Sequence, residues 1–311
     1  MIRRRSIAKA NLLEACQRLA YTVTGLVAVF ASSLAMAKVE NDEWPVRLRQ
    51  DLGRLSTIEW KLRSAAGGAC PTAGSDFGLG IDDRRDYLAK DWPLLARSVG
   101  LADKPVIAAV VGNSPGDRAG LRIGDAIISI NGVSAENLAR VDYAGPASEA
   151  VLGHLAGLPA GSPAAIIIRR DDAYLAFTVT PTSHCAVHFV LKTSESIDAY
   201  SDTANLAVTT GLLAFARTDD ELALVAGHEL AHILLRHSKS AGLRQRRKME
   251  DDADLEGARL AFCAGYDVAA ATAFFDRYAE KDFLSFLRAP THRSFRQRAK
   301  RIRAASGDLR C

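Results

Sequence analysis

Two histidines and a glutamate in the segment His228-Glu229-Leu230-Ala231-His232 have the types and the spacing needed for a metal-dependent hydrolytic site. Four residues of a helix advance about 6 Å and return close to the same face, so the two imidazoles can reach one metal ion. Glu229 is offset by one position, where its carboxylate can act as a general base toward a metal-activated water. A pair of ordinary helix histidines is the alternative, because so short a pattern also arises by chance.

A catalytic zinc ion needs three protein ligands and one open position, so the pattern requires a third ligand elsewhere in the chain. His237 is the nearest candidate, but it lies nine residues beyond His228 and is expected to face away from it on an unbroken helix. Leu235 and Ser238 stand where the longer metzincin motif needs glycine and histidine, which excludes that layout.

An acidic segment beyond the basic loop 244–248 offers better candidates for the third ligand. Glu250 opens this segment and is expected to begin a second helix, on which Asp254 shares its face. Glu250 could bind the metal while Asp254 accepts an imidazole N–H. An acidic helix start favoured by the helix dipole explains the same carboxylates. Spacing alone leaves both Glu250 and Glu256 open as the ligand.

The helix that carries the two histidines has a clear start signal. Thr218 and Glu221 form a capping box, so the helix is expected to begin at Asp219. The segment before it, about Asn205 to Thr209, is a candidate edge strand that could pair with an extended substrate. A purely structural strand explains that segment nearly as well.

The N-terminal half is expected to contain one amphipathic helix and then a strand-rich segment. Apolar residues at helical spacing predict the helix over 42–66, and glycines and Pro71 end it. Ser114 is suited to cap a short helix, and Asn131-Gly132 is a strong tight-turn signal. Strands are expected at 126–130, 164–168 and 174–180.

Part of this strand-rich half resembles a bacterial PDZ domain, with the similarity running over residues 76–183. Ser114-Pro115-Gly116-Asp117-Arg118-Ala119-Gly120-Leu121 carries the resemblance, together with the motifs at 124–127 and 130–132. The resemblance implies that the loop Gly78, Leu79, Gly80 and Ile81 offers backbone N–H groups to a C-terminal peptide. The alternative is that these glycines only shape a turn and the domain is a spacer.

The C-terminal part, roughly 190–303, resembles the HtpX-like and CAAX-prenyl-protease-like family of zinc metallopeptidases. Several motifs occur in the order found in that family, although Arg293 stands where its members usually carry proline. They are Ala199-Tyr200-Ser201-Asp202, Val208 to Leu213, Asp220 to Ala223, His228 to His232, His237, Glu250 with Ala253 and Asp254, Ala264 to Asp267, Thr291-His292 and Arg298.

The resemblance implies one Zn²⁺ per chain, held by His228, His232 and Glu250, with Glu229 as the base. It also makes His292 and Arg298 candidate stabilisers of the transition state. The expected fold class is α+β, with a mixed strand and helix PDZ domain followed by a mostly helical peptidase domain. The expected boundaries are 38–75 for the helix and linker, 76–184 for the PDZ domain and 190–311 for the peptidase.

Residues 1–37 have the layout of an export signal, because a basic cluster precedes an uncharged run that ends in Ala35-Met36-Ala37. Cleavage there is expected to start the mature chain at Lys38. An uncleaved anchor is the alternative, although polar residues weaken the run as a permanent span. Either way the chain is expected to be exported, as a periplasmic protein or one anchored to the inner membrane and facing the periplasm.

Export changes the meaning of the five cysteines, since disulfides persist outside the reducing cytosol. Cys70 and Cys185 bracket the PDZ-like segment and form a candidate disulfide, which would stabilise the fold by about 4 to 5 kcal/mol. Two unrelated buried thiols are an equal alternative. Cys263 is expected in a helical core, Cys311 is terminal and a candidate free thiol, and Cys16 lies inside the export signal.

Composition narrows the partners of the chain. A net charge of +4 over 311 residues with few aromatics gives no nucleic-acid footprint, so no nucleic-acid partner is expected. The basic loop 244–248 is a candidate contact with a membrane surface, and a solvated connector is preferred.

Together the motifs predict a zinc endopeptidase for unfolded or damaged envelope proteins, with the PDZ domain recruiting or gating polypeptide substrates. This substrate class rests on analogy with the family. The alternative is a catalytically silent adaptor or chaperone that binds peptides.

Overall fold

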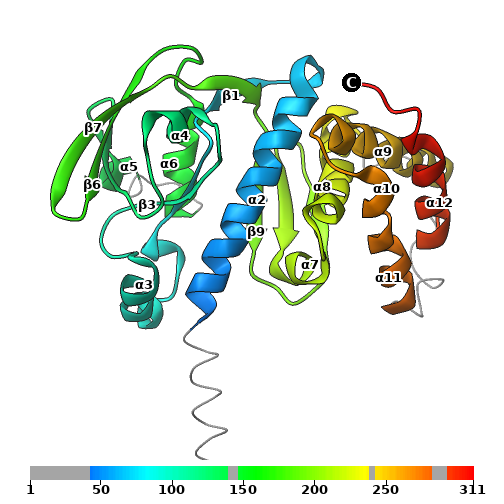
Figure 1. Cartoon of the computed structure of the whole chain (residues 1–311), viewed down its shortest axis with the longest axis horizontal. Coiled ribbons are helices and arrows are strands. Elements are labelled where there is room, and N and C mark those ends of the chain that lie inside the picture. Colours follow the sequence, from blue (N-terminus) through cyan, green and yellow to red (C-terminus); the bar gives the residue numbers. More distant parts are fainter. Residues whose placement is uncertain (1–42, 139–145, 238–241, 282–292) are drawn as a thin grey trace, which may run out of the picture. The chain divides into compact units, whose positions relative to one another are not determined.

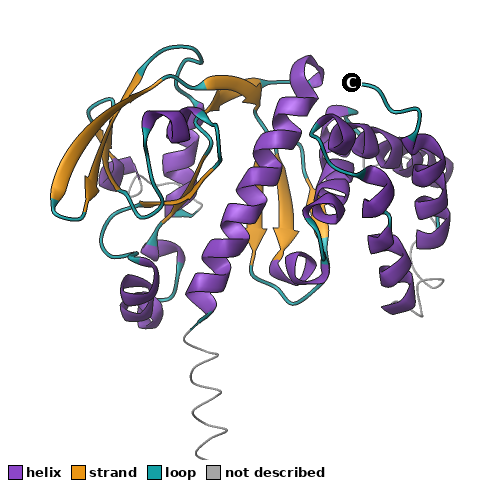
Figure 2. Ribbon diagram, viewed as in Figure 1, coloured by secondary structure: helices purple, strands orange, loops and turns teal. Residues whose placement is uncertain are grey.

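The computed structural model describes residues 43–138, 146–237, 242–281 and 293–311 (Figure 1). The expected export segment 1–37, with Cys16, and the candidate residue His292 lie outside the described residues. Residues 48–311 form one compact unit that contains two hydrophobic cores. Strands dominate around the first core and helices around the second (Figure 2), which confirms the expected α+β class. No helix in the described ranges is long and apolar enough to cross a membrane.

The first core lies against a six-stranded antiparallel sheet, here called the sheet region. The strand order is β2-β3-β4-β6-β7, and β5 pairs with β4. The three strands expected from the sequence are confirmed as β4, β6 and β7. The bounds are β2 (Leu79–Asp82), β3 (Val106–Val110), β4 (Ala126–Ile130), β5 (Val133–Ser134), β6 (Ala164–Arg170) and β7 (Ala173–Val179).

Side-chain alternation explains why this sheet has one buried face. In β6, Ala164, Ile166 and Ile168 are buried, whereas Ala165 and Ile167 between them are exposed, as the two-residue period of a strand requires. The helices of the sheet region are α3 (Trp92–Val99), α4 (Pro115–Ala119), α5 (Ala135–Leu138) and α6 (Ala147–Ala156).

Two turn signals in the sheet region are also confirmed. Ser114 caps α4, because its hydroxyl accepts the N–H of Asp117 at 3.3 Å. Asn131 and Gly132 both have positive φ, at 49° and 80°, and they connect β4 to β5.

The second core belongs to the helical region, which contains a three-stranded sheet and most of the helices. Helix α2 (Trp44–Ala66), expected from its amphipathic pattern, contributes Leu55, Ile58 and Leu62 to this core. The other elements are β9 (His188–Lys192), β10 (Ala199–Ser201), β11 (Asn205–Thr209), α7 (Thr210–Phe215), α8 (Asp219–Leu234), α9 (Leu243–Cys263), α10 (Val268–Ala271), α11 (Ala273–Lys281) and α12 (Phe295–Ser306).

The order of the three-stranded sheet corrects one expectation. Its strands run β10-β11-β9, with β11 antiparallel to β10 and parallel to β9. The segment Asn205–Thr209, expected at an edge, is therefore the central strand, since it has a partner on each side. Within the described residues, β10 is the edge strand next to α8.

Two disulfides tie the chain together. Cys70 is bonded to Cys185, the last residue of β8 (Thr182–Cys185), which pairs with β1 (Ala73–Asp76). Cys263 is bonded to Cys311, so the expectation of a buried thiol and a free terminal thiol is wrong. No pattern in the sequence indicates this pair, whose members lie 48 residues apart. Two disulfides indicate an oxidising environment outside the cytoplasm.

Candidate metal centre

Helices α8 and α9 touch through their backbones, and this contact builds the site. A Cβ atom on Gly257 would lie 2.5 Å from the backbone nitrogen of His228, and one on Gly227 would lie 2.7 Å from the carbonyl oxygen of Gly257. Glu250, Asp254 and Gly257 follow the spacing of one helix face. The glycine contact therefore turns both carboxylates toward His228.

The motifs in the sequence did not single out Gly227 and Gly257. A glycine inside a helix costs about 1 kcal/mol relative to alanine, so it often has a packing reason. Gly227 and Gly257 both lie inside helices that the sequence predicts, so these two glycines were the signal that could have indicated a close contact between the helices.

The start of α8 follows the expected capping pattern with one difference. The Thr218 hydroxyl accepts the N–H of Glu221 at 3.3 Å, and the helix begins at Asp219. The Glu221 carboxylate accepts the N–H of Arg217, one residue before the cap, at 2.8 Å. It also pairs with Arg277 of α11 at 2.6 Å, which fixes the first turn of α8 to the helices around the site.

Three side-chain atoms converge at the α8–α9 contact. Nε2 of His228 and Nε2 of His232 are 3.1 Å apart, and Oε2 of Glu250 lies 3.3 and 3.5 Å from them. All three atoms lie within 4.8 Å of one another. Zn–N bonds of about 2.0–2.1 Å at tetrahedral angles separate donor atoms by about 3.3 Å. The donor set and its spacing therefore fit a zinc ion.

The same geometry separates the two glutamates that spacing alone left open. Glu250 belongs to the group of donors, whereas both carboxylate oxygens of Glu256 bind Arg259, at 2.6 and 2.9 Å. Glu256 is thus engaged on its own helix, one turn from Arg259. Glu250 is the third candidate ligand.

Glu229, the expected base, directly follows His228 on α8 and is half-buried. The Ser201 hydroxyl, at the end of β10, donates a hydrogen bond to Glu229 Oε2 at 2.9 Å. The edge strand of the small sheet therefore contacts the side chain expected to move protons.

A buried ion pair supports His228 from behind. Nδ1 of His228 lies 3.0 Å from Asp254 Oδ1, and Arg298 Nη2 donates to the same oxygen at 2.6 Å. Asp254 and Arg298 are 3 % and 8 % exposed, so the pair is shielded from water. Arg298 therefore lies on the Nδ1 side of the ring, opposite the donor group, and these contacts give no support to the expected role in stabilising the transition state.

Electrostatics in this pair favour an ionised Asp254. Burial alone would raise the pKa of Asp254, but the charge of Arg298 and the hydrogen bond with His228 hold it at about 2. Burial and Arg298 lower the pKa of His228, yet hydrogen bonds to Asp254 and Glu250 outweigh them and raise that pKa to about 9. A metal ion at Nε2 must displace a proton, so metal binding is expected to weaken as the pH falls.

His237 corrects a second expectation. Helix α8 ends at Leu234, and Arg236 has a positive φ of 51°, so the chain reverses instead of continuing as an unbroken helix. His237 Nδ1 consequently lies 2.8 Å from His232 Nδ1. It does not join the donor group, but it contacts a candidate ligand through the ring nitrogen that faces away from that group.

Helix α9 corrects a third expectation, because it begins at Leu243 and not at Glu250. The basic segment 244–248, expected as a loop, is therefore helical, and it is exposed. Asp251 in the next turn pairs with Arg293 at 2.6 Å and with Arg301 of α12 at 2.9 Å. These pairs anchor α9 close to Glu250.

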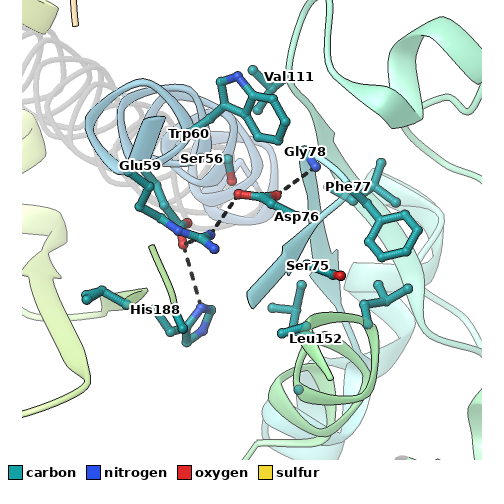
Figure 3. A pocket seen from close by; sticks show the side chains of 18 of the residues that line it. Ser56, Glu59, Trp60, Ser75, Asp76, Phe77, Gly78, Val111, Leu152 and His188 are labelled. Atoms are coloured by element: carbon teal, nitrogen blue, oxygen red, sulfur yellow. Dashed lines mark hydrogen bonds and ion pairs between the residues drawn. The ribbon is translucent and has the colours of Figure 1, made fainter. Parts of the chain in front are cut away.

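A second candidate site is a cavity of about 220 Å³ beside β2 (Figure 3). Its walls are β2 and the preceding loop, α6, the polar face of α2, and the segment 186–188. Three residues of the loop expected to bind peptide, Gly78, Leu79 and Gly80, line this cavity, whereas Ile81 is buried in the core of the sheet region.

Charged side chains meet in this cavity. Arg63 Nη1 lies 3.0 Å from a carboxylate oxygen of Glu59 and 3.0 Å from one of Asp76. Asp76 Oδ1 accepts the N–H of Gly78 at 2.9 Å (Figure 3). Burial raises the pKa of Glu59 to about 7 despite Arg63 beside it. Burial also lowers the pKa of His188, which lies 3.8 Å from Glu59.

Comparison with known proteins agrees with this arrangement. Residues 172–246 match the model of peptidase family M48, and residues 106–149 match a PDZ domain model. The M48 match includes both histidines and Glu229 and stops before Glu250. No curated protein matches the chain significantly.

Solved structures similar to this chain include two of the HtrA-type protease AlgW with a decapeptide, at 22 % and 20 % identity and TM-scores of 0.28 and 0.27. They cover 36 % and 40 % of this chain, which spans 30 % and 33 % of theirs. The HtrA3 PDZ domain bound to a phage-derived ligand is 18 % identical with a TM-score of 0.27, over 36 % of this chain and 89 % of that one. From the two family matches and the donor group, the chain combines an M48 metallopeptidase region, with a candidate His-His-Glu zinc site, and a PDZ domain ahead of it.

Proposed function

We propose that this chain is a zinc-dependent endopeptidase that hydrolyses unfolded or damaged envelope proteins. One observation carries the proposal: Nε2 of His228, Nε2 of His232 and Oε2 of Glu250 lie within 4.8 Å of one another. Two imidazoles and one carboxylate leave a fourth position for water or substrate, which is the ligand set of a catalytic zinc site.

The reaction requires a base, and Glu229 is placed to provide it. A zinc ion held by His228, His232 and Glu250 would supply Lewis acidity toward the scissile carbonyl and the attacking water. Glu229 removes the proton from that water and returns it to the leaving amine. Its contact with Ser201 holds one carboxylate oxygen, so the other can face the water.

Neighbouring side chains keep the ligands in the required form. Asp254 accepts a hydrogen bond from Nδ1 of His228, which leaves Nε2 free to bind the metal, and Arg298 keeps Asp254 ionised. His237 occupies the equivalent position behind His232. An extended substrate would pair with the edge strand β10, which lies against α8.

The PDZ domain is proposed to hold a peptide, such as the C-terminus of a substrate, in the cavity beside β2. In the described part of the sheet, β2 pairs only with β3, so a peptide can add to its other edge. The cavity also reaches Glu59 and Arg63 of α2, whose apolar face packs in the core of the peptidase region. A bound peptide would therefore contact both regions, as recruitment or gating requires.

The proposed location is the periplasm, in free or inner-membrane-anchored form. The two disulfides support an oxidising compartment, and the sequence of residues 1–37 supports export.

A second candidate function is a catalytically silent adaptor or chaperone. The cavity beside β2 favours it, because peptide binding there needs no turnover. The two functions differ in what they require of Glu229, which only an enzyme needs.

Casein cleavage by the zinc-loaded chain tests the proposal. Glu229→Gln should reduce cleavage at least 100-fold while zinc content stays unchanged. Glu256→Gln is the matched control, since Glu256 binds Arg259 away from the donor group, and it should cleave normally. If the Glu229 variant cleaved casein as fast as the wild type, the endopeptidase function would be rejected and the adaptor or chaperone function would be favoured.

A further inference from the structure

Ser201 occupies an unusual position between the small sheet and the candidate base. It is the last residue of β10, paired with Leu206 of β11. Ser201 and Ala199 are partly buried, whereas Tyr200 between them is 43 % exposed. The alternation of a strand therefore directs Ser201 away from solvent, and its hydroxyl lies 2.9 Å from Glu229 Oε2.

Among the described residues, Ser201 is the only hydrogen-bond partner of the Glu229 carboxylate. A free glutamate side chain samples several rotamers, and a base acts efficiently only when it is held within reach of the proton that it removes. One hydrogen bond from a side chain on a paired strand can hold Oε2 and leave Oε1 for the water. The strand itself is fixed by its ladder with β11.

We infer that Ser201 is a positioning residue for the general base. Its hydroxyl links Glu229 to β10, the strand along which the substrate aligns. This role rests on the proposed endopeptidase function and adds a residue to it. Because Ser201 ends the edge strand, substrate alignment and base orientation depend on the same short element. The hydroxyl contacts Glu229 and none of the three candidate ligands, so its loss should affect turnover and not metal binding.

The test compares Ser201→Ala, Ser201→Thr, Glu229→Gln and the Ser201→Ala/Glu229→Gln double variant in the zinc-loaded full chain. The alanine change removes one oxygen atom and keeps the backbone pairing of β10. With a fluorogenic peptide as substrate, Ser201→Ala should lower kcat about tenfold, because the variant loses one hydrogen bond to a charged group. Its KM should stay within about twofold of the wild-type value. Ser201→Thr, which keeps a hydroxyl, should recover most of that loss.

Two further measurements separate positioning from a general structural effect. Zinc content and the unfolding midpoint of Ser201→Ala should equal those of the wild type. Crystal structures should show Glu229 in one conformer in the wild type and in several in the variant. Ser196→Ala is the matched control, because the Ser196 hydroxyl contacts Ser194 and not the base, and it should leave kcat unchanged.

The double variant supplies the decisive outcome. Once Glu229 is glutamine, losing the Ser201 hydroxyl should cause no further loss of turnover, since both changes act through one group. An unchanged kcat in Ser201→Ala, or an equal loss in both backgrounds, would overturn the inference while leaving the endopeptidase intact. Full turnover in Glu229→Gln would instead overturn the proposed function, and the positioning role with it.

Discussion

Gly257 packs against the backbone of His228 so closely that a Cβ atom at position 257 would lie 2.5 Å from the His228 nitrogen. This contact between α9 and α8 sets the distance between the two helices that supply the candidate ligands. The metal centre therefore depends on a residue that has no side chain.

Gly257→Ala should destabilise the fold by about 1–3 kcal/mol, because the added methyl group must push two helix backbones apart. It should also weaken zinc binding, since Glu250 would move away from both histidines. Urea unfolding and a competitive zinc chelator measure the two effects. Gly53→Ala in α2 is the matched control, because a Cβ atom there meets nothing within 4 Å, and it should stabilise by about 0.5–1 kcal/mol. Zinc binding and stability unchanged in Gly257→Ala would contradict the close contact.

Glu250→Ala should strip zinc from the purified chain, whereas Glu256→Ala should retain one ion. The expectation follows from the positions of the two carboxylates, since Glu250 faces both histidines and Glu256 binds Arg259. Elemental analysis after dialysis gives the stoichiometry. If the Glu256 variant lost zinc and the Glu250 variant kept it, Glu256 and not Glu250 would be the third ligand.

Asp254→Asn should lower zinc affinity about 10- to 100-fold, because the variant loses the carboxylate that orients His228. It also leaves Arg298 buried beside a neutral amide, so the unfolding midpoint should fall. His237→Ala should weaken zinc binding less than Asp254→Asn, since His237 is a neutral partner of His232 and closer to solvent. Competition with a chelator ranks the variants. Wild-type affinity in Asp254→Asn would show that the carboxylate does not support the ligand.

Glu59 predicts a pH-dependent loss of stability. Its pKa is raised by burial to about 7 from an ordinary 4.5, so the folded chain binds this proton more tightly than the unfolded chain does. The resulting contribution to stability is present below about pH 4.5 and disappears as the pH rises through 7. Glu59→Gln should remove this dependence.

Urea unfolding at pH 5 and pH 8 checks this prediction. The stability of the wild type relative to Glu59→Gln should fall by up to ~3 kcal/mol between the two values. Glu195→Gln, a change at an exposed glutamate, controls for altered net charge. A difference between wild type and Glu59→Gln that stays constant with pH would contradict the raised pKa.

The sequence predicted those features that local chemistry determines. Thr218, Ser114 and the Asn131-Gly132 turn act within a few residues, so their patterns located α8, α4 and the β4–β5 connection. The spacing of His228 and His232 placed two candidate ligands on one helix face.

The features that the sequence did not predict depend on contacts between distant segments. Arg236 adopts a positive φ that few residues other than glycine favour, so the return of His237 to His232 had no local signal. The pairing order of β9, β10 and β11 and the bond between Cys263 and Cys311 likewise arise only when the chain folds.

The His-His-Glu zinc site can be observed by anomalous diffraction at the zinc absorption edge, from crystals of the zinc-loaded chain. We expect one strong peak per chain, about 2.0–2.2 Å from His228 Nε2, His232 Nε2 and a carboxylate oxygen of Glu250. No peak at these three atoms, or a peak that Glu250 does not reach, would contradict it.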